Sequence, residues 1–121
     1  MIRTHGLSHI ALAVADPERS ARFYRDAFGA EEYYRDANEI QVKGPGAFDV
    51  LAFSRDPGQA GRRGGVAHFG FRLIRPEDID DAVAAVLAAG GSLLRRGEFK
   101  PGFPFAFVAD PDGYELEIWF E

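Results

Sequence analysis

VAHFGFRL, residues 66–73, places a histidine among apolar residues, and LSHIALAV, residues 7–14, does the same near the N-terminus. In both stretches the bulky apolar side chains occupy alternate positions, which is the pattern of a β-strand with one buried face. Each histidine falls on the opposite face, together with small residues such as Ala11 and Gly70. The two stretches therefore predict two similar strands, each with an imidazole on a face that has room for another group.

A helix is predicted after each of these strands. Asp16 and Pro17 supply a capping residue and a proline at the first helical position, and residues 18–28 carry apolar side chains at helical spacing. Pro76 comes before a second segment of this kind, residues 77–89, and glycine follows both segments. The order of strand, helix and glycine stop is thus repeated within one chain.

Three shorter strands are expected after each helix. The sequence predicts them at 30–35, 39–43 and 47–55 in the first half and at 92–98, 103–109 and 114–120 in the second. We therefore predict an α+β fold of two βαβββ modules, residues 1–55 and 66–121. A flexible glycine-rich linker, residues 56–65, joins them within one domain of residues 1–121.

Composition excludes several classes of function. A net charge of −5 disfavours a nucleic-acid partner, and the absence of cysteine excludes disulfides and thiolate metal sites. No apolar run approaches the roughly 20 residues of a membrane span, and the N-terminus lacks the apolar core of a signal peptide. We expect a cytoplasmic protein that binds neither nucleic acid nor a membrane.

The repeated histidines indicate a metal site. If the modules pack around a pseudo-twofold axis with their concave faces together, His9 and His68 point into one cleft. Residues 114–120 offer a carboxylate, because Glu115 and Glu117 share the face opposite to the apolar one. Two imidazoles and one carboxylate form a facial triad that suits Fe, Mn, Co, Ni or Zn and leaves positions open for a substrate. The residues alone do not choose between the two glutamates or among the metals.

Three stretches of the chain resemble the vicinal oxygen chelate superfamily, which includes glyoxalase I, bleomycin-resistance proteins and extradiol dioxygenases. They are LSHIALAVADPERSARFYRDAFG at 7–29, VAHFGFRL at 66–73 and ADPDGYELEIW at 109–119. The resemblance implies the glyoxalase/bleomycin-resistance/dioxygenase fold, in which two βαβββ modules form a curved mixed sheet with a concave cleft.

The resemblance also implies a set of metal ligands. The matching positions are His9, His68 and Glu117, because the family's carboxylate is the fourth residue after the glycine of DPDG. Glu115 is then an accessory or surface acid. His5 matches no ligand, and we expect it to be exposed. Catalytic residues other than the metal ligands stay unassigned.

Departures from family patterns limit the choice of activity. Glyoxalase I uses a further glutamate from the first half, and alignment of residues 48–53 with 114–119 puts Leu51 there, with Asp49 on the same face. Fosfomycin-resistance enzymes carry a polar stretch before DPDG, where this chain has the apolar residues 100–109. Extradiol dioxygenases use an additional histidine, and no fourth histidine exists here.

An aromatic cleft with one cation is the expected substrate site. Arg72 shares the predicted face of His68 and is suited to an anionic group. The remaining candidate residues that contact substrate are Phe103, Phe105, Phe107, Trp119 and Gln41.

Two functions follow as hypotheses. The first is a metal-dependent enzyme, dioxygenase-like or glyoxalase-like, that acts on a small substrate, aromatic or otherwise, through two adjacent oxygens. The alternative is a non-catalytic protein that sequesters a drug or metabolite, as bleomycin-resistance proteins do. The resemblance further implies a homodimer in which His9 of one chain completes the site of the other. The alternative is a monomer whose single site lies within one chain.

Overall fold

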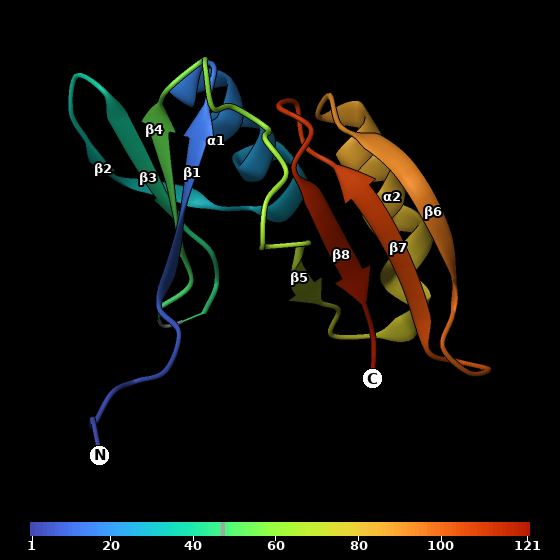
Figure 1. The fold of residues 1–121 in the computed structure, drawn as a ribbon. Coiled ribbons are helices and arrows are strands. Elements are labelled where there is room, and N and C mark those ends of the chain that lie inside the picture. The colour runs from blue at the N-terminus through green and yellow to red at the C-terminus, as the bar shows by residue number, and fades with distance from the viewer. Residues whose placement is uncertain (47) are drawn as a thin grey trace. The chain divides into compact units, whose positions relative to one another are not determined.

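The computed structural model describes residues 1–46 and 48–121, and each half of it has the same succession of elements (Figure 1). The first half contains β1 (His9–Val14), α1 (Pro17–Phe28), β2 (Glu31–Arg35), β3 (Glu39–Lys43) and β4 (Val50–Arg55). The second contains β5 (Phe69–Arg72), the 3-10 helix η1 (Pro76–Asp78), α2 (Ile79–Ala88), β6 (Ser92–Glu98), β7 (Pro104–Ala109) and β8 (Glu115–Trp119). The predicted α+β fold of two βαβββ modules is confirmed.

Two strands begin three residues later than expected. The predicted strand 66–73 is reduced to β5, and His68 lies just before it. The single partner of β5 in its sheet is β8, and the pairing begins where Phe69 lies opposite Leu116. Residues 66–68 come before that point and are therefore not part of the strand. The predicted strand 47–55 begins at Val50 as β4, and its expected first residue, Ala47, lies outside the described residues.

Each module has its own four-stranded mixed sheet, and the two sheets have the same topology. The strand orders are β1-β4-β3-β2 and β5-β8-β7-β6. The first and last strands of each module are parallel neighbours, while the other neighbours are antiparallel. Both outer pairs contain a register shift, between Glu32 and Tyr34 in β2 and between Leu93 and Arg95 in β6. The internal repeat therefore extends to the position of a β-bulge.

Each helix packs on one face of its own sheet (Figure 1). In the first module, Phe23 and Tyr24 of α1 are buried, and Tyr24 stacks on Phe53 of β4 with ring centroids 5.1 Å apart. The start of α1 is as predicted, because the Asp16 carboxylate accepts a hydrogen bond of 3.0 Å from the backbone N–H of Glu18.

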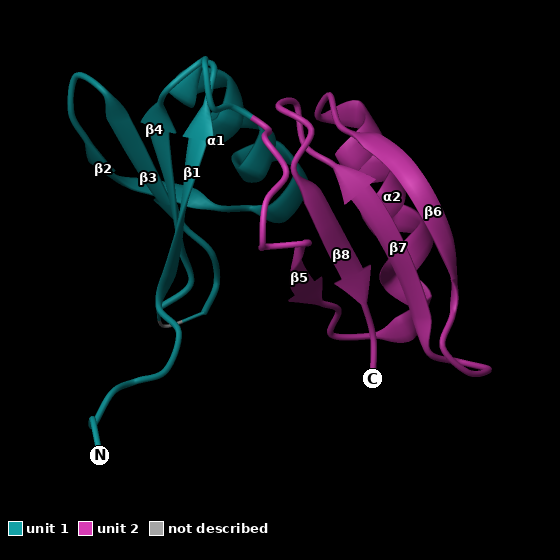
Figure 2. Cartoon of the chain, in the orientation of Figure 1, with its two compact units in different colours: residues 1–60 teal, residues 61–121 magenta. Residues whose placement is uncertain are grey.

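The chain divides into two compact units, residues 1–60 and 61–121 (Figure 2). The division falls inside the segment 56–65 that was expected to be a linker. The first part of that segment is a hydrogen-bonded turn, since the backbone N–H groups of Gln59 and Ala60 both donate to the carbonyl of Asp56. No helix in the described part of the chain is long and apolar enough to cross a membrane.

Candidate functional site

Strict alternation along the last two strands separates a core face from a polar and aromatic face in the second unit. Leu116 and Ile118 of β8 and Val108 of β7 are buried on the side of α2. We call the opposite side the site face, and it is formed by Gly70, Arg72, Phe105, Phe107, Glu115, Glu117 and Trp119. Arg72, Phe105, Phe107 and Trp119 therefore share one face with Glu117, and their contact with a substrate stays a prediction.

Strand register arranges these side chains in two rows that cross the sheet. One row runs Gly70, Glu117, Phe107 and Arg95, from β5 through β8 and β7 to β6. The next row runs Arg72, Trp119, Phe105 and Gly97 over the same strands. Neighbours in a row have adjacent side chains on the same face.

His68 and Glu117 meet on the site face. The Nε2 atom of His68 lies 3.2 Å from Oε2 of Glu117, and the side chains are 37% and 16% exposed. The ring of Phe107 contacts the imidazole edge-on, with centroids 5.1 Å apart. Two of the three predicted metal ligands are therefore adjacent, and an aromatic ring supports one of them.

Glu115 has different partners from Glu117. Its Oε1 atom lies 2.6 Å from Nη2 of Arg95, and its Oε2 atom lies 3.8 Å from Nη2 of Arg63. The Arg95 guanidinium also lies over the ring of Phe107, 3.9 Å from its centroid. Glu115 is thus neutralised by arginines, while the partner of Glu117 among the described residues is a histidine.

The second row carries a cation on an aromatic ring. The guanidinium of Arg72 lies over Trp119, 5.6 Å from the ring centroid. Gly70 lies close to β8, because a Cβ atom there would lie 3.1 Å from the Glu117 carbonyl oxygen and 3.4 Å from Nε1 of Trp119. A side chain at position 70 would crowd both the strand backbone and the indole.

Phe103 lies apart from these rows. It precedes β7, and its ring is 6.2 Å from that of Phe120, with the ammonium group of Lys100 4.1 Å from its centroid. Phe105 instead lies in the second row and packs against Phe99 at 4.7 Å. The predicted aromatic wall thus consists of Phe105, Phe107 and Trp119 on the site face, with Phe103 at the turn before it.

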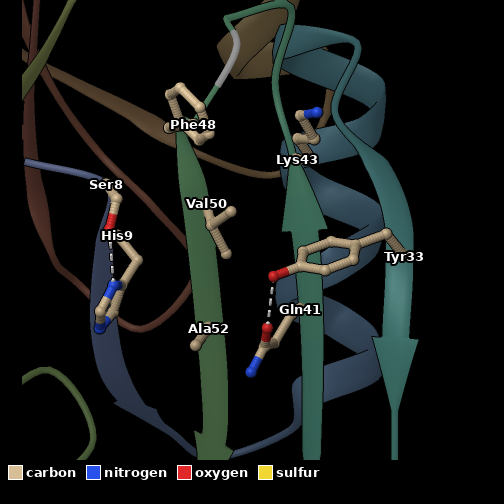
Figure 3. A pocket seen from close by; sticks show the side chains of 8 residues that line it. All are labelled: Ser8, His9, Tyr33, Gln41, Lys43, Phe48, Val50 and Ala52. Atoms are coloured by element: carbon tan, nitrogen blue, oxygen red, sulfur yellow. Dashed lines mark hydrogen bonds between the residues drawn. The ribbon is translucent and has the colours of Figure 1, made fainter. Parts of the chain in front are cut away.

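The first unit has a cavity of about 590 Å³ on the matching face of its own sheet (Figure 3). It is lined by Ser8, His9, Tyr33, Gln41, Lys43, Phe48, Val50 and Ala52. Figure 3 shows His9 and Gln41 on the strands to either side of β4, with Val50 and Ala52 between them. Both predicted site residues of this unit, His9 and Gln41, therefore line one cavity.

Hydrogen bonds orient the polar side chains of this cavity. Nδ1 of His9 is hydrogen-bonded to Oγ of Ser8 at 3.1 Å. The Tyr33 hydroxyl donates to Oε1 of Gln41 at 2.8 Å, and the Gln41 amide donates in turn to the Glu39 carboxylate. Tyr33 was not predicted, because it lies in the bulged part of β2, where simple alternation does not assign a face.

His5 is exposed, as predicted, but it has a ring partner. Its imidazole stacks on Phe48 with centroids 4.6 Å apart and an angle of 22° between the planes. The partner of His5, Phe48, is itself one of the residues that line the cavity.

The parallel registers correct one position in the sequence alignment of the modules. Ala11 lies opposite Ala52 in the first unit, and Gly70 lies opposite Glu117 in the second. Ala52 is therefore the counterpart of Glu117, and Leu51 was wrongly aligned by one residue. Leu51 is only 9% exposed and belongs to the core, because it follows the alternation of β4 toward α1. Neither Leu51 nor Ala52 offers a carboxylate, so the first module lacks the further glutamate of glyoxalase I at either position.

The three predicted ligands are distributed over the two units. His68 and Glu117 belong to the second unit, and His9 belongs to the first. Within residues 1–46 and 48–121, no three histidine, aspartate or glutamate side chains gather closely enough to hold a metal ion. The three-ligand site therefore stays a prediction.

Comparison with known proteins identifies the family. The model of the Glyoxalase/Bleomycin resistance protein/Dioxygenase superfamily matches residues 6–118, so the chain belongs to this superfamily. The chain is 32% identical over 120 residues to a probable lactoylglutathione lyase of Vibrio parahaemolyticus, a match that covers 91% of this chain and 86% of the relative. The predicted resemblance is thereby confirmed.

A second relative has a different activity in its name. The chain is 31% identical over 115 residues to a manganese-dependent 2,3-dihydroxybiphenyl 1,2-dioxygenase of Geobacillus genomosp. 3. This match covers 93% of the chain but only 36% of the dioxygenase, and the chain spans 42% of the length of two plant relatives.

The fold has close counterparts among solved structures. A glyoxalase-related enzyme from Fulvimarina pelagi superposes with a TM-score of 0.80 at 28% identity, covering 98% of this chain and 89% of that one. The fosfomycin resistance protein FosX of Listeria monocytogenes superposes with a TM-score of 0.82 at 22% identity, covering 98% and 95% of the two chains. At that identity the second likeness establishes the fold alone.

Proposed function

We propose that this chain is a divalent-metal-dependent enzyme, dioxygenase-like or glyoxalase-like, that acts on a small substrate with two adjacent oxygens. The observation that carries the proposal is the approach of His68 Nε2 to Glu117 Oε2 at 3.2 Å on an aromatic face. An imidazole and a carboxylate side by side are donors that Fe, Mn, Co, Ni and Zn accept. The manganese-dependent relative supports the same chemistry.

The donor chemistry of the chain fits such a metal. Glu117 is largely covered and lacks an arginine partner among the described residues, which is unfavourable for a carboxylate unless it binds a cation. In the first unit, Nδ1 of His9 is hydrogen-bonded to Ser8 Oγ, and in the tautomer in which Nδ1 donates, Nε2 carries the lone pair that a metal would accept. His9, His68 and Glu117 would hold the ion, which would supply Lewis acidity to two substrate oxygens.

The other side chains of the site face orient the ligands and the substrate. Phe107 packs edge-on against His68 and is itself covered by the Arg95 guanidinium, which Glu115 holds at 2.6 Å. This chain of contacts restricts the rotation of the imidazole. Phe105 and Trp119 extend the aromatic surface along the next row and favour a flat or apolar substrate that excludes water.

Metal analysis combined with an activity screen tests the proposal. Protein purified without chelator is expected to contain about one divalent ion per site. The screen measures oxygen uptake with catechols, including 2,3-dihydroxybiphenyl, and isomerisation of 2-oxoaldehyde–thiol adducts. Turnover that disappears on chelation and returns with added Mn²⁺, Fe²⁺, Ni²⁺, Co²⁺ or Zn²⁺ supports the proposal. Protein that binds none of these ions contradicts it.

A second candidate function is sequestration of an aromatic drug or metabolite without chemistry. The observation in its favour is that His68 and Glu117 contact each other directly, with Nε2 and Oε2 3.2 Å apart, beside the ring of Phe107. Tight binding of an aromatic compound by metal-free protein, without turnover in any arm of the screen, would support this second function.

We also propose that two chains form a homodimer with shared sites. A module of about 60 residues buries little surface alone, so each module needs a partner. In the shared arrangement, His9 of one chain completes the His68 and Glu117 pair of the other.

A further inference from the structure

The site face has more arginine side chains near it than carboxylates to pair with them. Arg63 and Arg95 both lie near Glu115, at 3.8 Å and 2.6 Å. Arg72, on the same face, has no carboxylate partner among the described residues, and its recorded contact is the ring of Trp119. Three guanidinium groups therefore surround two carboxylates, in a chain whose net charge is −5. A local excess of positive charge on an acidic protein favours an anionic ligand.

The contact with Trp119 holds Arg72 without using its hydrogen-bond donors. A cation–π contact is an attraction between the charge and the ring and requires no N–H donor of the guanidinium, so those donors are available to a ligand. Those donors form a planar fork that matches the two oxygens of a carboxylate. Arg95 is less suited to this role, because one of its nitrogens is already bound to Glu115 at 2.6 Å.

Arg72 also lies at the correct place relative to the proposed metal ligands. On β5, Gly70 lies opposite Glu117, and Arg72 lies two residues further along, opposite Trp119. Trp119 is the next residue of β8 on the face of Glu117. The guanidinium thus belongs to the row directly beside the row of Glu117. A planar substrate that reaches a metal through its oxygens would extend over Trp119 toward Arg72.

We propose that the substrate carries a carboxylate, in addition to its two adjacent oxygens, and that Arg72 binds this carboxylate. The inference rests on the proposed function, because it uses the same site. A singly charged group is the appropriate partner, since Arg72 is the single guanidinium of the site face left without a carboxylate in the described part of the chain. Arg72 is then a residue that determines specificity and takes no part in bond making.

The single tryptophan of the chain provides a direct measurement. Trp119 is the only tryptophan in the sequence, so tryptophan fluorescence, excited selectively over the tyrosines, reports on the second row. The probes are 2,3- and 3,4-dihydroxybenzoate and the corresponding dihydroxybenzamides, which have almost the same size but no charge. Each probe is titrated into wild-type, Arg72→Gln and Arg72→Lys protein, with and without added Mn²⁺. Affinity is read from the midpoint, which does not depend on the starting fluorescence of the variant.

The proposal predicts a change in the ratio of acid to amide affinity. In Arg72→Gln this ratio should fall roughly tenfold relative to wild type, the effect of one charged hydrogen-bonded contact, while the affinity for the amide stays constant. Differences in acidity between the probes cancel, because the ratio is compared between proteins. Arg72→Lys should be intermediate, since it keeps the charge and loses the fork. Arg96→Gln is the control, because Arg96 lies beside Asp80 at 2.6 Å, away from the site face.

The outcomes separate this inference from the function on which it rests. If both probes bind better with Mn²⁺ and Arg72→Gln leaves the ratio unchanged, the inference is wrong and the proposed function stands. If added metal changes no affinity, the metal-dependent function is wrong. A preference for the acid that still requires Arg72 would then support Arg72 as the carboxylate site of a metal-free binding protein.

Discussion

Ala52 occupies in the first module the position that Glu117 occupies in the second. The parallel strand pairs establish this, because Ala52 lies opposite Ala11 and Glu117 lies opposite Gly70. The duplicated frame therefore presents a histidine in both modules but a carboxylate in only one. The neighbouring strand differs as well. In the first module Gln41 lies opposite Ala52, and in the second Phe107 lies opposite Glu117. At these two positions the first module thus has a methyl group and an amide, where the second has a carboxylate and an aromatic ring.

The first prediction separates the two glutamates of β8. Glu117→Gln should weaken the binding of Mn²⁺ or Zn²⁺ roughly a hundredfold or more, because it removes the only anionic ligand of the proposed set. Glu115→Gln should leave metal affinity within a fewfold of wild type, since its carboxylate is held by Arg95 and Arg63. Isothermal titration of metal-free protein measures both affinities.

Two further variants complete this comparison. Glu98→Gln removes an exposed glutamate of β6 and should leave the affinity for the metal unchanged. His68→Ala should lose metal to the same extent as Glu117→Gln. Retention of wild-type metal content by His68→Ala would show that the ligand assignment is wrong.

A second prediction concerns the turn that positions β8. Asp110 is buried, and its Oδ1 atom accepts hydrogen bonds of 3.0 Å from the backbone N–H groups of both Asp112 and Tyr114. Asp110→Ala should lower the free energy of unfolding by about 2 kcal/mol, because two backbone donors lose their acceptor. Urea denaturation followed by Trp119 fluorescence measures the change within this module.

The conservative variant distinguishes hydrogen bonding from packing at this turn. Asp110→Asn retains one oxygen acceptor and should recover more than half of the lost stability. Equal losses in Asp110→Asn and Asp110→Ala would contradict the assigned role of the two hydrogen bonds.

A third prediction concerns pH. The pKa of Asp36 is lowered from its usual 3.8, first by the hydrogen bond from the Asn38 backbone and then by those from the Tyr34 hydroxyl and the Glu39 backbone. A carboxyl group with a depressed folded-state pKa stabilises the fold above the unfolded pKa, and that stability is lost as pH falls through the folded pKa. The stability difference between wild type and Asp36→Ala should therefore be largest above about pH 5 and shrink below pH 3.8.

Urea midpoints from circular dichroism, measured between pH 3 and pH 7, test this dependence. Tyr34→Phe removes one of the three donors and should show a smaller effect with the same pH dependence. A difference between wild type and Asp36→Ala that is constant over the whole range would contradict the prediction.

Much of the fold follows from the sequence, because the decisive signals are local. Alternation along β8 assigns Leu116 and Ile118 to the core and Glu117 to the other face, as the structure has them. The cap at Asp16 and the positive φ of Gly29 fix the ends of α1 by side-chain and backbone chemistry that is visible in the residue types. These features require no knowledge of distant contacts.

The partners of the site residues required information that alternation does not contain. In β6 the register shift between Leu93 and Arg95 moves Arg95 onto the site face, where strict alternation would turn it to the core. Its contacts with Phe107 and Glu115 depend on that bulge. The misalignment at Leu51 has a similar origin, because the pairing between strands sets the register and the spacing from the preceding turn does not.

The last prediction tests whether the site is shared between two chains. His9 belongs to the unit of residues 1–60, whereas His68 and Glu117 belong to the unit of residues 61–121. Mixing His9→Ala with Glu117→Ala protein under conditions of subunit exchange should restore metal binding in a shared-site dimer. Each heterodimer combines both lesions in one site and leaves the other intact, so a random mixture should recover about one quarter of the wild-type sites.

A second mixture makes the same test in the opposite direction. In a chain with both His9→Ala and Glu117→Ala, every heterodimer with wild type has one lesion in each of its shared sites. An equal mixture with wild type should then fall to about one quarter of the sites of pure wild type, and stay at about one half if each site lies within a single chain. Exchange is verified by mass spectrometry of the dimers. Proven exchange with no recovery in the first mixture and one half in the second would overturn the shared arrangement, because each chain would then supply all three ligands to its own site.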